Sequence, residues 1–261
     1  MRTKIKFEVA PEFMELESWI SQMRENFSGS GETIFKLRNE VKVFKINNYK
    51  LNVKAFKIPN PINRFVYVSF RGSKAARSYR YARKFRSLGI DTPMAVGFIE
   101  YTENGLLTNS YYVSLHLDCN YTLREVIDFH FEIRDDILRQ WVRFTYDKLH
   151  KNGIFHLDYS PGNTLITESD GQYQFWVIDL NRMIFGEVAF EKGLSNFCQL
   201  RIDHSTLELI GREYALLRGE NPAKAVKIIV DYEIKRAAKL EKKDRLKHIL
   251  KWVFRRGHAG I

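Results

Sequence analysis

The chain has 261 residues, of which 44% are hydrophobic, and its formal net charge is +11. This length and hydrophobic content suffice for a globular core. The positive charge predicts an anionic partner, which could be nucleotide phosphate, nucleic acid, an acidic lipid surface or a phosphorylated glycan. The two cysteines, Cys119 and Cys198, belong to no C-x-x-C pair. We therefore expect reduced thiols and neither zinc nor redox chemistry.

The N-terminus lacks the unbroken apolar segment and the cleavage site of a secretory signal. The sequence also contains no run of about 18 apolar residues, the length that a bilayer-spanning helix needs. We expect a cytoplasmic protein whose contact with any membrane is peripheral.

The first half is predicted to be rich in strands. Residues 32–70 alternate between apolar and polar side chains, which indicates antiparallel strands around the turn-prone sequence NNYK. Residues 73–88 contain neither Pro nor Gly, begin with Ser73 as a capping residue and stop before Gly89, which predicts a helix. Residues 93–101 and 110–117 then read as two further strands.

The second half is predicted to be mainly helical. Residues 122–131 and 133–153 carry apolar side chains at helical spacing, and Thr145 interrupts the stripe of the second segment. The fold class is therefore α+β, with a small antiparallel-sheet N-lobe at residues 1–115 and a larger helical C-lobe at residues 116–261. We expect the ligand site in the cleft between the lobes.

The stretch HLDYSPGNTLITESDGQYQFWVIDLNR, residues 156–182, is either a phosphotransfer site or a buried helix-to-strand turn. Phosphoryl transfer requires positioned cations and an oriented hydroxyl. Asp158, on a loop, could accept a hydroxyl proton. Asn163 and Asp179 could hold Mg²⁺ between nucleotide phosphates.

The same stretch carries a family resemblance. H-L-D-Y-S-P-G-N resembles the kinase catalytic loop H-x-D-x-x-x-x-N, and V-I-D-L-N-R resembles the metal-binding Asp motif. D-L-N-R replaces D-F-G and no A-P-E segment follows, so a eukaryotic-type protein kinase fits poorly. Together with VKAFK and SKAARSYRYARKFRSLGIDTP, these motifs are similar to the bacterial lipopolysaccharide core kinase family, the Kdo and heptose kinases, over about residues 35–190.

The resemblance implies a two-lobed protein-kinase-like fold that uses ATP and Mg²⁺. It implies that Asp158 is the catalytic base and that Asn163 and Asp179 are the metal ligands. Lys54 occupies the V-K position that the family uses to reach the α and β phosphates, with Lys57 as the alternative. The implied reaction transfers the γ-phosphoryl group to a sugar hydroxyl of an anionic glycolipid, the lipopolysaccharide inner core.

One departure from kinases keeps other functions open. Kinases hold this lysine with a Glu on the following helix, yet residues 73–88 contain no Asp or Glu. Either another carboxylate such as Glu100 steadies the lysine, or the pair is missing and turnover is reduced. The alternatives are a pseudokinase or regulatory nucleotide-binding module, and a kinase acting on protein or another small molecule. Nucleic acid is not expected as a partner, because only the charge suggests it.

Three further features each have two interpretations. The basic residues of the 73–88 helix could clamp an anionic acceptor or form a solvated basic face. His156 is expected to be a packed, hydrogen-bonded loop residue. The C-terminal helix could lie on an anionic inner leaflet or pack on its own lobe. The basic residues of the first feature are Arg77, Arg80, Arg83, Lys84 and Arg86, and the apolar face of the C-terminal helix comprises Leu246, Ile249, Leu250, Val253 and Phe254.

Overall fold

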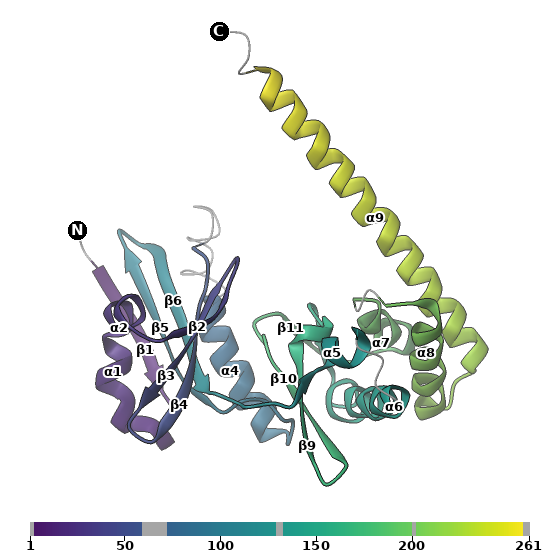
Figure 1. Cartoon of the computed structure of the whole chain (residues 1–261), viewed down its shortest axis with the longest axis horizontal. Coiled ribbons are helices and arrows are strands. Elements are labelled where there is room, and N and C mark those ends of the chain that lie inside the picture. The colour runs from purple at the N-terminus through teal and green to yellow at the C-terminus, as the bar shows by residue number, and fades with distance from the viewer. Residues whose placement is uncertain (1–2, 59–71, 129–132, 200–201, 258–261) are drawn as a thin grey trace. The chain divides into compact units, whose positions relative to one another are not determined.

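The computed structural model describes residues 3–58, 72–128, 133–199 and 202–257 (Figure 1). The chain forms two compact units. Unit 1 comprises Met1–Glu125 and Gly162–Ile184, and unit 2 comprises Val126–Pro161 and Phe185–Ile261. The lobe boundary after residue 115 stays a prediction, because the units are grouped by contacts and unit 1 also takes in a later segment of the chain. The strand expected at residues 64–70 lies outside the described residues.

Unit 1 contains a six-stranded sheet in the order β1-β5-β6-β4-β3-β2, with every neighbouring pair antiparallel. The described part of the predicted antiparallel sheet is therefore confirmed. The strands are β1 (Thr3–Val9), β2 (Glu32–Lys36), β3 (Glu40–Ile46), β4 (Tyr49–Ala55), β5 (Ala95–Glu103) and β6 (Leu106–Leu115).

Helices cover both faces of this sheet (Figure 1). The short helices η1 (Pro11–Leu16), α1 (Glu17–Ser21) and α2 (Met23–Gly29) lie on one face, and α4 (Lys74–Ser87) lies on the other. The ring of Tyr79 in α4 lies 5.4 Å from that of Phe98 in β5. Lys54 is paired across strands with Tyr112, and Tyr112 is paired with Phe98. Directly paired residues of neighbouring strands share one face of a sheet, so Lys54 lies on the face that α4 covers.

Helix α4 begins where the sequence predicts. Ser73 is its N-cap, and the Ser73 side chain accepts a hydrogen bond from the backbone N–H of Ala76 at 3.1 Å. The helix ends before Gly89, whose φ of 65° few other residues adopt easily. These two signals are local, which explains why the sequence predicts both ends.

A smaller antiparallel sheet completes unit 1. It consists of β7 (Tyr121–Thr122), β9 (Thr164–Ser169) and β10 (Gln172–Val177), with β9 in the centre. The strands predicted around NTLI and FWVIDL are β9 and β10. They bring the two ends of the 162–179 segment together, and β11 (Met183–Phe185) follows.

The remaining elements are mostly helical, as predicted. They are α5 (Leu123–Asp128), α6 (Arg134–Phe144), the π-helix η3 (Thr145–His150), β8 (Ile154–His156), η4 (Pro161–Asn163), α7 (Phe190–Phe197), α8 (His204–Arg218) and α9 (Pro222–Gly257). The helix predicted over residues 133–153 is thus α6 continued by a π-turn. At the junction the Thr145 hydroxyl donates to the carbonyl of Trp141 at 2.8 Å, a side-chain bond that competes with the regular helical ladder.

The core of unit 2 includes a buried polar group around His150. Its Nδ1 lies 2.8 Å from the Tyr214 hydroxyl, and its Nε2 lies 3.2 Å from Oδ1 of Asn196. Burial is the main cause that lowers the pKa of His150 to about 4. A Cβ at Gly193 would lie 2.0 Å from the Tyr214 hydroxyl, so helix α7 can approach this group only because residue 193 has no side chain.

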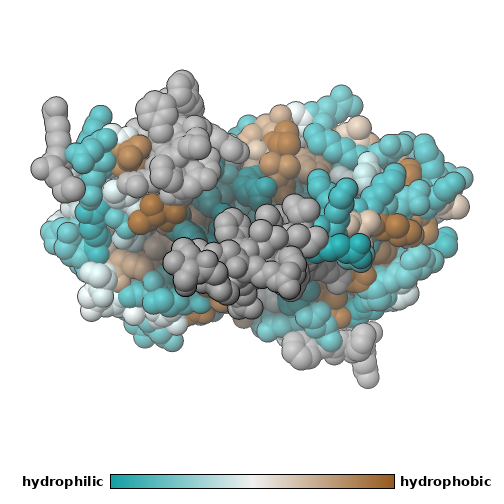
Figure 2. Space-filling model, turned by 90° about the horizontal axis from the view of Figure 1, so that it is seen from above, coloured by the Kyte–Doolittle hydropathy of each residue, from teal (hydrophilic) through white to brown (hydrophobic). Residues whose placement is uncertain are grey.

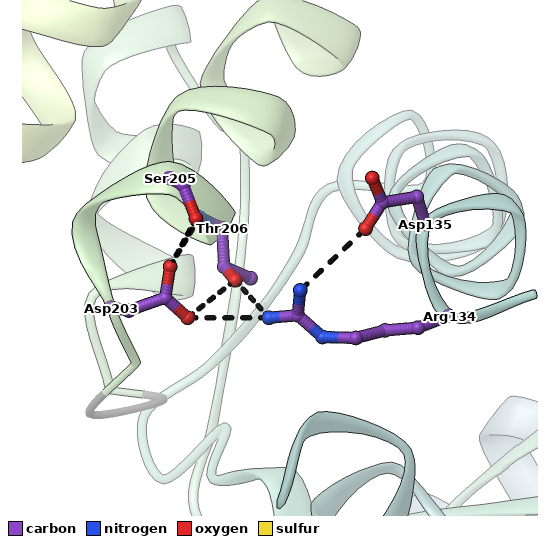
Figure 3. Close-up of polar contacts among 5 residues, drawn as sticks. All are labelled: Arg134, Asp135, Asp203, Ser205 and Thr206. Atoms are coloured by element: carbon purple, nitrogen blue, oxygen red, sulfur yellow. Dashed lines mark hydrogen bonds and ion pairs between the residues drawn. The ribbon is translucent and has the colours of Figure 1, made fainter. Parts of the chain in front are cut away.

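A polar contact joins the starts of α6 and α8 (Figure 3). Asp203 is the N-cap of α8 and accepts from the Thr206 backbone N–H at 2.9 Å. Arg134, the first residue of α6, donates to the Asp203 carboxylate at 3.2 Å. Burial acts to raise the pKa of Asp203, but hydrogen bonds from Ser205 and Thr206 and the charge of Arg134 lower it below its usual range.

On the face shown in Figure 2, hydrophobic side chains lie in separate patches among hydrophilic ones, outside the grey atoms. Exposed apolar side chains include Leu37, Leu216 and Ile234. Among the described residues, no helix is both long enough and apolar enough to span a bilayer. The predicted C-terminal helix is present as α9, but its predicted apolar face, residues 246–254, lies outside the side chains that the structure describes.

Candidate functional site

Lys54 and Asp179 form an ion pair within unit 1. The Lys54 Nζ lies 2.8 Å from Oδ1 of Asp179, and the two side chains are 19% and 22% exposed. Lys57, the alternative lysine, lies beyond the end of β4 with an exposed side chain, and its backbone N–H donates to Oδ1 of Asn39 at 3.1 Å. The structure therefore brings Lys54 to the predicted metal-binding carboxylate.

Asp179 lies just beyond the end of β10, in a backbone conformation with a φ of 59°. A positive φ is uncommon for a non-glycine residue and persists only where the surroundings hold it. The side-chain amide of Asn181 donates to Oδ1 of Asp179, the same oxygen that binds Lys54. The sequence D-L-N thus folds into a tight local structure around the carboxylate.

Asn163 is held beside this segment by the backbone. The N–H of Ile178 donates to the carbonyl of Asn163 at 2.9 Å, which extends the β9–β10 pairing by one bond. The Asn163 side chain is half-buried. The predicted metal ligands therefore belong to neighbouring backbone segments, although they are 16 positions apart in the sequence.

The chemistry of these donors fits Mg²⁺. A carboxylate and an amide oxygen are hard oxygen ligands, and Mg²⁺ usually combines one or two such groups with water and nucleotide phosphates. Within the part of the chain that the structure describes, no group of three or more His, Cys, Asp and Glu side chains could hold a metal ion. The donor set thus suits a metal that arrives with a nucleotide better than a cage built from protein ligands alone.

Glu100 does not take the place that the sequence suggested for it. Its Oε1 accepts a hydrogen bond from the backbone N–H of Ser73 at 3.1 Å, and only 8% of the residue is exposed. A carboxylate here is favoured by the positive end of the helix dipole of α4. Glu100 thus anchors the start of α4, whereas the carboxylate that pairs with Lys54 is Asp179.

Arg77 connects α4 to the segment that follows Asp179. Its Nε donates to the carbonyl of Asn181 at 3.0 Å and its Nη1 to the carbonyl of Gly72 at 2.7 Å. Arg77 is only 4% exposed. The Arg77 guanidinium therefore binds backbone carbonyls inside unit 1. The interpretation of Arg77 as part of a clamp for an anionic acceptor is wrong.

Asp158 belongs to unit 2, where backbone contacts shape its loop. Its N–H donates to Nδ1 of His156 at 3.0 Å, and its carbonyl accepts from the N–H of Ser160 at 2.8 Å. His156 is fully buried, and its own carbonyl accepts from the Asn196 amide at 2.7 Å. Because Nδ1 accepts a hydrogen bond, the proton of a neutral His156 is on Nε2. His156 is a packed, hydrogen-bonded loop residue, as predicted.

Tyr159 fixes the next position of the same loop. Its ring stacks on Trp141 with 5.4 Å between centroids and 22° between planes. Its hydroxyl lies 2.9 Å from that of Thr145, and both aromatic residues are fully buried. The Thr145 side chain, which interrupts the apolar stripe in the sequence, therefore ties the π-turn to the loop that carries Asp158.

The structure thus brings Lys54, Asn163 and Asp179 together in unit 1 and places Asp158 in unit 2, five positions before Asn163 in the chain. Sequence reasoning missed Asn181 and the internal role of Arg77. The signal for Asn181 was its position two residues after an Asp at a strand end, where a short amide can bond the carboxylate.

Solved structures show the fold of the chain. One is WaaP in complex with acyl carrier protein, which is 16% identical, with coverage of 91% of this chain and 98% of that one and a TM-score of 0.61. Another is an aminoglycoside-3'-phosphotransferase of type VIII, which is 10% identical, with coverage of 85% and 100% and a TM-score of 0.54. At these identities the likeness shows a kinase-like fold, which confirms the predicted fold class.

The sequence comparisons show the family. A search of curated proteins found no match. The family described as "Lipopolysaccharide kinase (Kdo/WaaP) family" matches residues 38–197, which is more than half of the chain and includes Lys54, Asp158, Asn163 and Asp179. The chain therefore belongs to the lipopolysaccharide kinase (Kdo/WaaP) family, and it is accordingly an ATP-using phosphotransferase.

Proposed function

We propose that the protein transfers the γ-phosphoryl group of ATP, with Mg²⁺, to a sugar hydroxyl of Kdo or heptose in the lipopolysaccharide inner core. The observation that carries the proposal is the ion pair of Lys54 with Asp179, beside which the backbone holds Asn163. This arrangement occurs in a chain of a lipopolysaccharide kinase family. A lysine next to two oxygen donors suits the phosphates and the metal of a nucleotide.

Each residue has a distinct role in this proposal. Lys54 positions the phosphates through its ammonium group. Asn163 and Asp179 hold Mg²⁺, which when bound neutralises charge on the phosphate oxygens. Asp158 orients the sugar hydroxyl and accepts its proton, and the bond from its N–H to His156 supports the loop that presents it.

Asp158→Asn tests the proposal, because it removes the base and keeps the size of the side chain. With ATP, Mg²⁺ and a Kdo-lipid A acceptor, we expect phosphate transfer to fall by about 10²- to 10⁴-fold. The matched control is Asp147→Asn, which alters a 40% exposed carboxylate of the same unit that pairs with Lys151. That variant should transfer phosphate at the wild-type rate. Equal activity of Asp158→Asn and wild type would exclude the base role.

The acceptor is identified by parallel reactions with Kdo-lipid A and with a heptosylated form of it. Mass spectrometry of the products shows which sugar gains the phosphate. Nucleotide binding without transfer to either acceptor would favour a regulatory module instead. Transfer to a protein or a small molecule alone would replace the lipopolysaccharide assignment.

We also propose that the protein acts in the cytoplasm and contacts the inner membrane peripherally. The net charge of +11 supports this, because anionic lipid surfaces attract basic proteins. Sedimentation with vesicles that contain phosphatidylglycerol should carry down more protein than phosphatidylcholine vesicles do. Raising the salt concentration should remove the difference.

A further inference from the structure

Two ammonium groups lie over the same aromatic ring in unit 1. The Nζ of Lys54 is 5.4 Å from the centroid of Phe56, and the Nζ of Lys74 is 6.0 Å from it. Phe56 itself is buried, with 7% exposure. The ring therefore holds the two lysines in one region, on the α4 face of the sheet.

Lys74 occupies an electrostatically unfavourable position. It is the first residue of α4, where the helix dipole is positive, and the first turn contains no acidic residue. The nearby acid at this helix end, Glu100, is engaged by the N–H of Ser73. A cation at the N-terminus of a helix lowers the stability of the folded protein unless an anion offsets its charge.

Within the described residues, the surrounding charges do not offset the charge of Lys74. Lys74 is half-buried, and burial followed by the charge of Arg38 lowers its pKa, while Asp179 acts in the opposite direction. Arg77 and Lys54 add to the repulsion. The Asp179 carboxylate is already paired with Lys54 at 2.8 Å. This cluster of cations therefore has a surplus of positive charge, which a bound anion would neutralise.

The turn between β2 and β3 gives a second reason to expect an anion near Lys74. In kinases a glycine-rich turn covers the phosphates with its backbone N–H groups. Here the turn consists of Leu37, Arg38 and Asn39, with no glycine, and the N–H of Leu37 donates to the carbonyl of Asn39 at 3.1 Å. Without glycine, side chains hinder close approach of this backbone to a phosphate, and the N–H of Leu37 is engaged within the turn, so side-chain cations would have to replace some of the backbone contacts.

We propose that Lys74 is a second phosphate-binding residue, which together with Lys54 binds the polyphosphate chain of the nucleotide. This rests on the proposed function for the ligand, but not on the identity of the sugar acceptor. The ammonium of Lys74 would donate charge-assisted hydrogen bonds to phosphate oxygens. The start of α4 would thereby take over phosphate contacts from the glycine-free turn.

The test is a binding experiment without acceptor. The whole chain, in Mg²⁺ buffer, is titrated with ATP, adenosine and inorganic tripolyphosphate, and Kd is measured for wild type, Lys74→Met, Lys74→Arg and Lys6→Met. Lys6 is an exposed lysine of the edge strand β1 and serves as the matched control. Lys74→Met should raise Kd for ATP and tripolyphosphate about tenfold to a hundredfold. Adenosine binding should not change, and Lys74→Arg should recover most of the affinity.

A second measurement separates binding from folding. Lys74→Met removes a repelled cation, so without ligand its thermal midpoint should equal or exceed that of wild type. Its stabilisation by ATP should nevertheless shrink. The proposal would be overturned if Lys74→Met bound ATP and tripolyphosphate with the same Kd as wild type. It would also be overturned if the thermal midpoint of the unliganded variant were lowered enough that partial unfolding explained the weaker binding.

Steady-state kinetics shows whether Lys74 contacts the phosphates of the nucleotide or those of the glycolipid acceptor. A Lys74→Met variant with an unchanged KM for ATP and a raised KM for the glycolipid would assign Lys74 to the acceptor and overturn the proposal. Failure of wild type to phosphorylate any lipopolysaccharide acceptor would count against the proposed function alone. The role of Lys74 would stand in that case if the tripolyphosphate titrations differ as expected.

Discussion

The two halves of the 156–182 stretch differ in the contacts around Asp158 and Asp179. Residues 156–161 belong to unit 2, where Tyr159 and His156 are fully buried. Residues 162–182 include the Asp179 segment of unit 1, where the ion pair with Lys54 is about one-fifth exposed at each end. Both halves contain buried side chains, but Asp158 lies next to fully buried aromatic packing, whereas Asp179 is held by a partly exposed ion pair.

This difference matches the two tasks of a phosphotransferase. A base must keep one position, and a closely packed core resists displacement. In the proposed function, the phosphate and metal site would have to exchange partners, because Lys54, now paired with Asp179, would have to contact the nucleotide. An ion pair whose two ends both reach solvent can exchange partners at a lower cost than a fully buried pair can.

The largest expected effect concerns the packed half. Tyr159→Ala should lower the free energy of unfolding by about 3–5 kcal/mol, because it leaves a cavity beside Trp141. Tyr159→Phe keeps the ring and removes the hydroxyl that lies 2.9 Å from that of Thr145, which should cost about 1 kcal/mol. Urea unfolding measures both. Equal losses would mean that the hydroxyl, not the stacked ring, holds the loop.

The next effect concerns the charged half. Lys54→Met should lower kcat/KM for ATP by about 10²- to 10³-fold, the loss typical of a single group that stabilises the transition state. Its thermal midpoint should fall less than that of Tyr159→Ala, because both ends of the lost pair reach solvent and the Asn181 amide still donates to Asp179. Lys57→Met provides the comparison, since this side chain is exposed beyond the end of β4. A greater loss in Lys57→Met would transfer the phosphate role to that residue.

Acid should destabilise the packed core of unit 2. The pKa of His150 in the folded protein, about 4, lies below the 6.5 of the unfolded chain. The unfolded state therefore binds more protons between these values, so stability is full above pH 6.5 and falls as the pH drops toward 4. The loss from this group is about 3 kcal/mol.

Urea unfolding at several pH values measures this dependence. His150→Gln should flatten it, whereas His204→Gln, which changes a residue with a 64% exposed side chain, should leave it unchanged. An identical pH profile in wild type and His150→Gln would assign the acid sensitivity to another group.

The smallest expected effect concerns the tether between α4 and the Asp179 segment. Arg77→Met should cost about 1–3 kcal/mol, because it leaves the buried carbonyl of Asn181 and the half-buried carbonyl of Gly72 without these donors. Activity should fall further than in Arg80→Met, which changes an exposed arginine of the same helix. In the Arg80 control, the Nε of Arg80 donates to the carbonyl of Ala76 in its own helix, at 3.4 Å. Equal activity of the two variants would show that α4 does not position Asp179.

Local signals in the sequence predict much of the fold. Ser73 and Gly89 delimit α4, and alternation places Lys54 on one face of β4. The π-turn at Thr145 was not predicted, since it depends on contacts of Thr145 with Tyr159 from a later loop. A periodic apolar stripe does not reveal such a long-range bond.

The sequence predicted less of the candidate site than of the fold. The spacing of Asp158, Asn163 and Asp179 suggested their roles, which stay proposals. The partner of Lys54 was not foreseen, because the two residues are far apart in the chain and are brought together by elements of two different sheets. The buried Arg77 looked like one more basic residue on a helix, since composition does not show which arginine faces inward.

The positive φ of Asp179 allows the backbone conformation and the charge at the proposed metal site to be tested separately. Asparagine and aspartate adopt the left-handed region more often than other non-glycine residues such as alanine. Aspartate at position 179 can therefore be replaced by an amide that keeps the backbone turn and removes the negative charge. A replacement by alanine would change both at once, and its effect could not be attributed to the carboxylate.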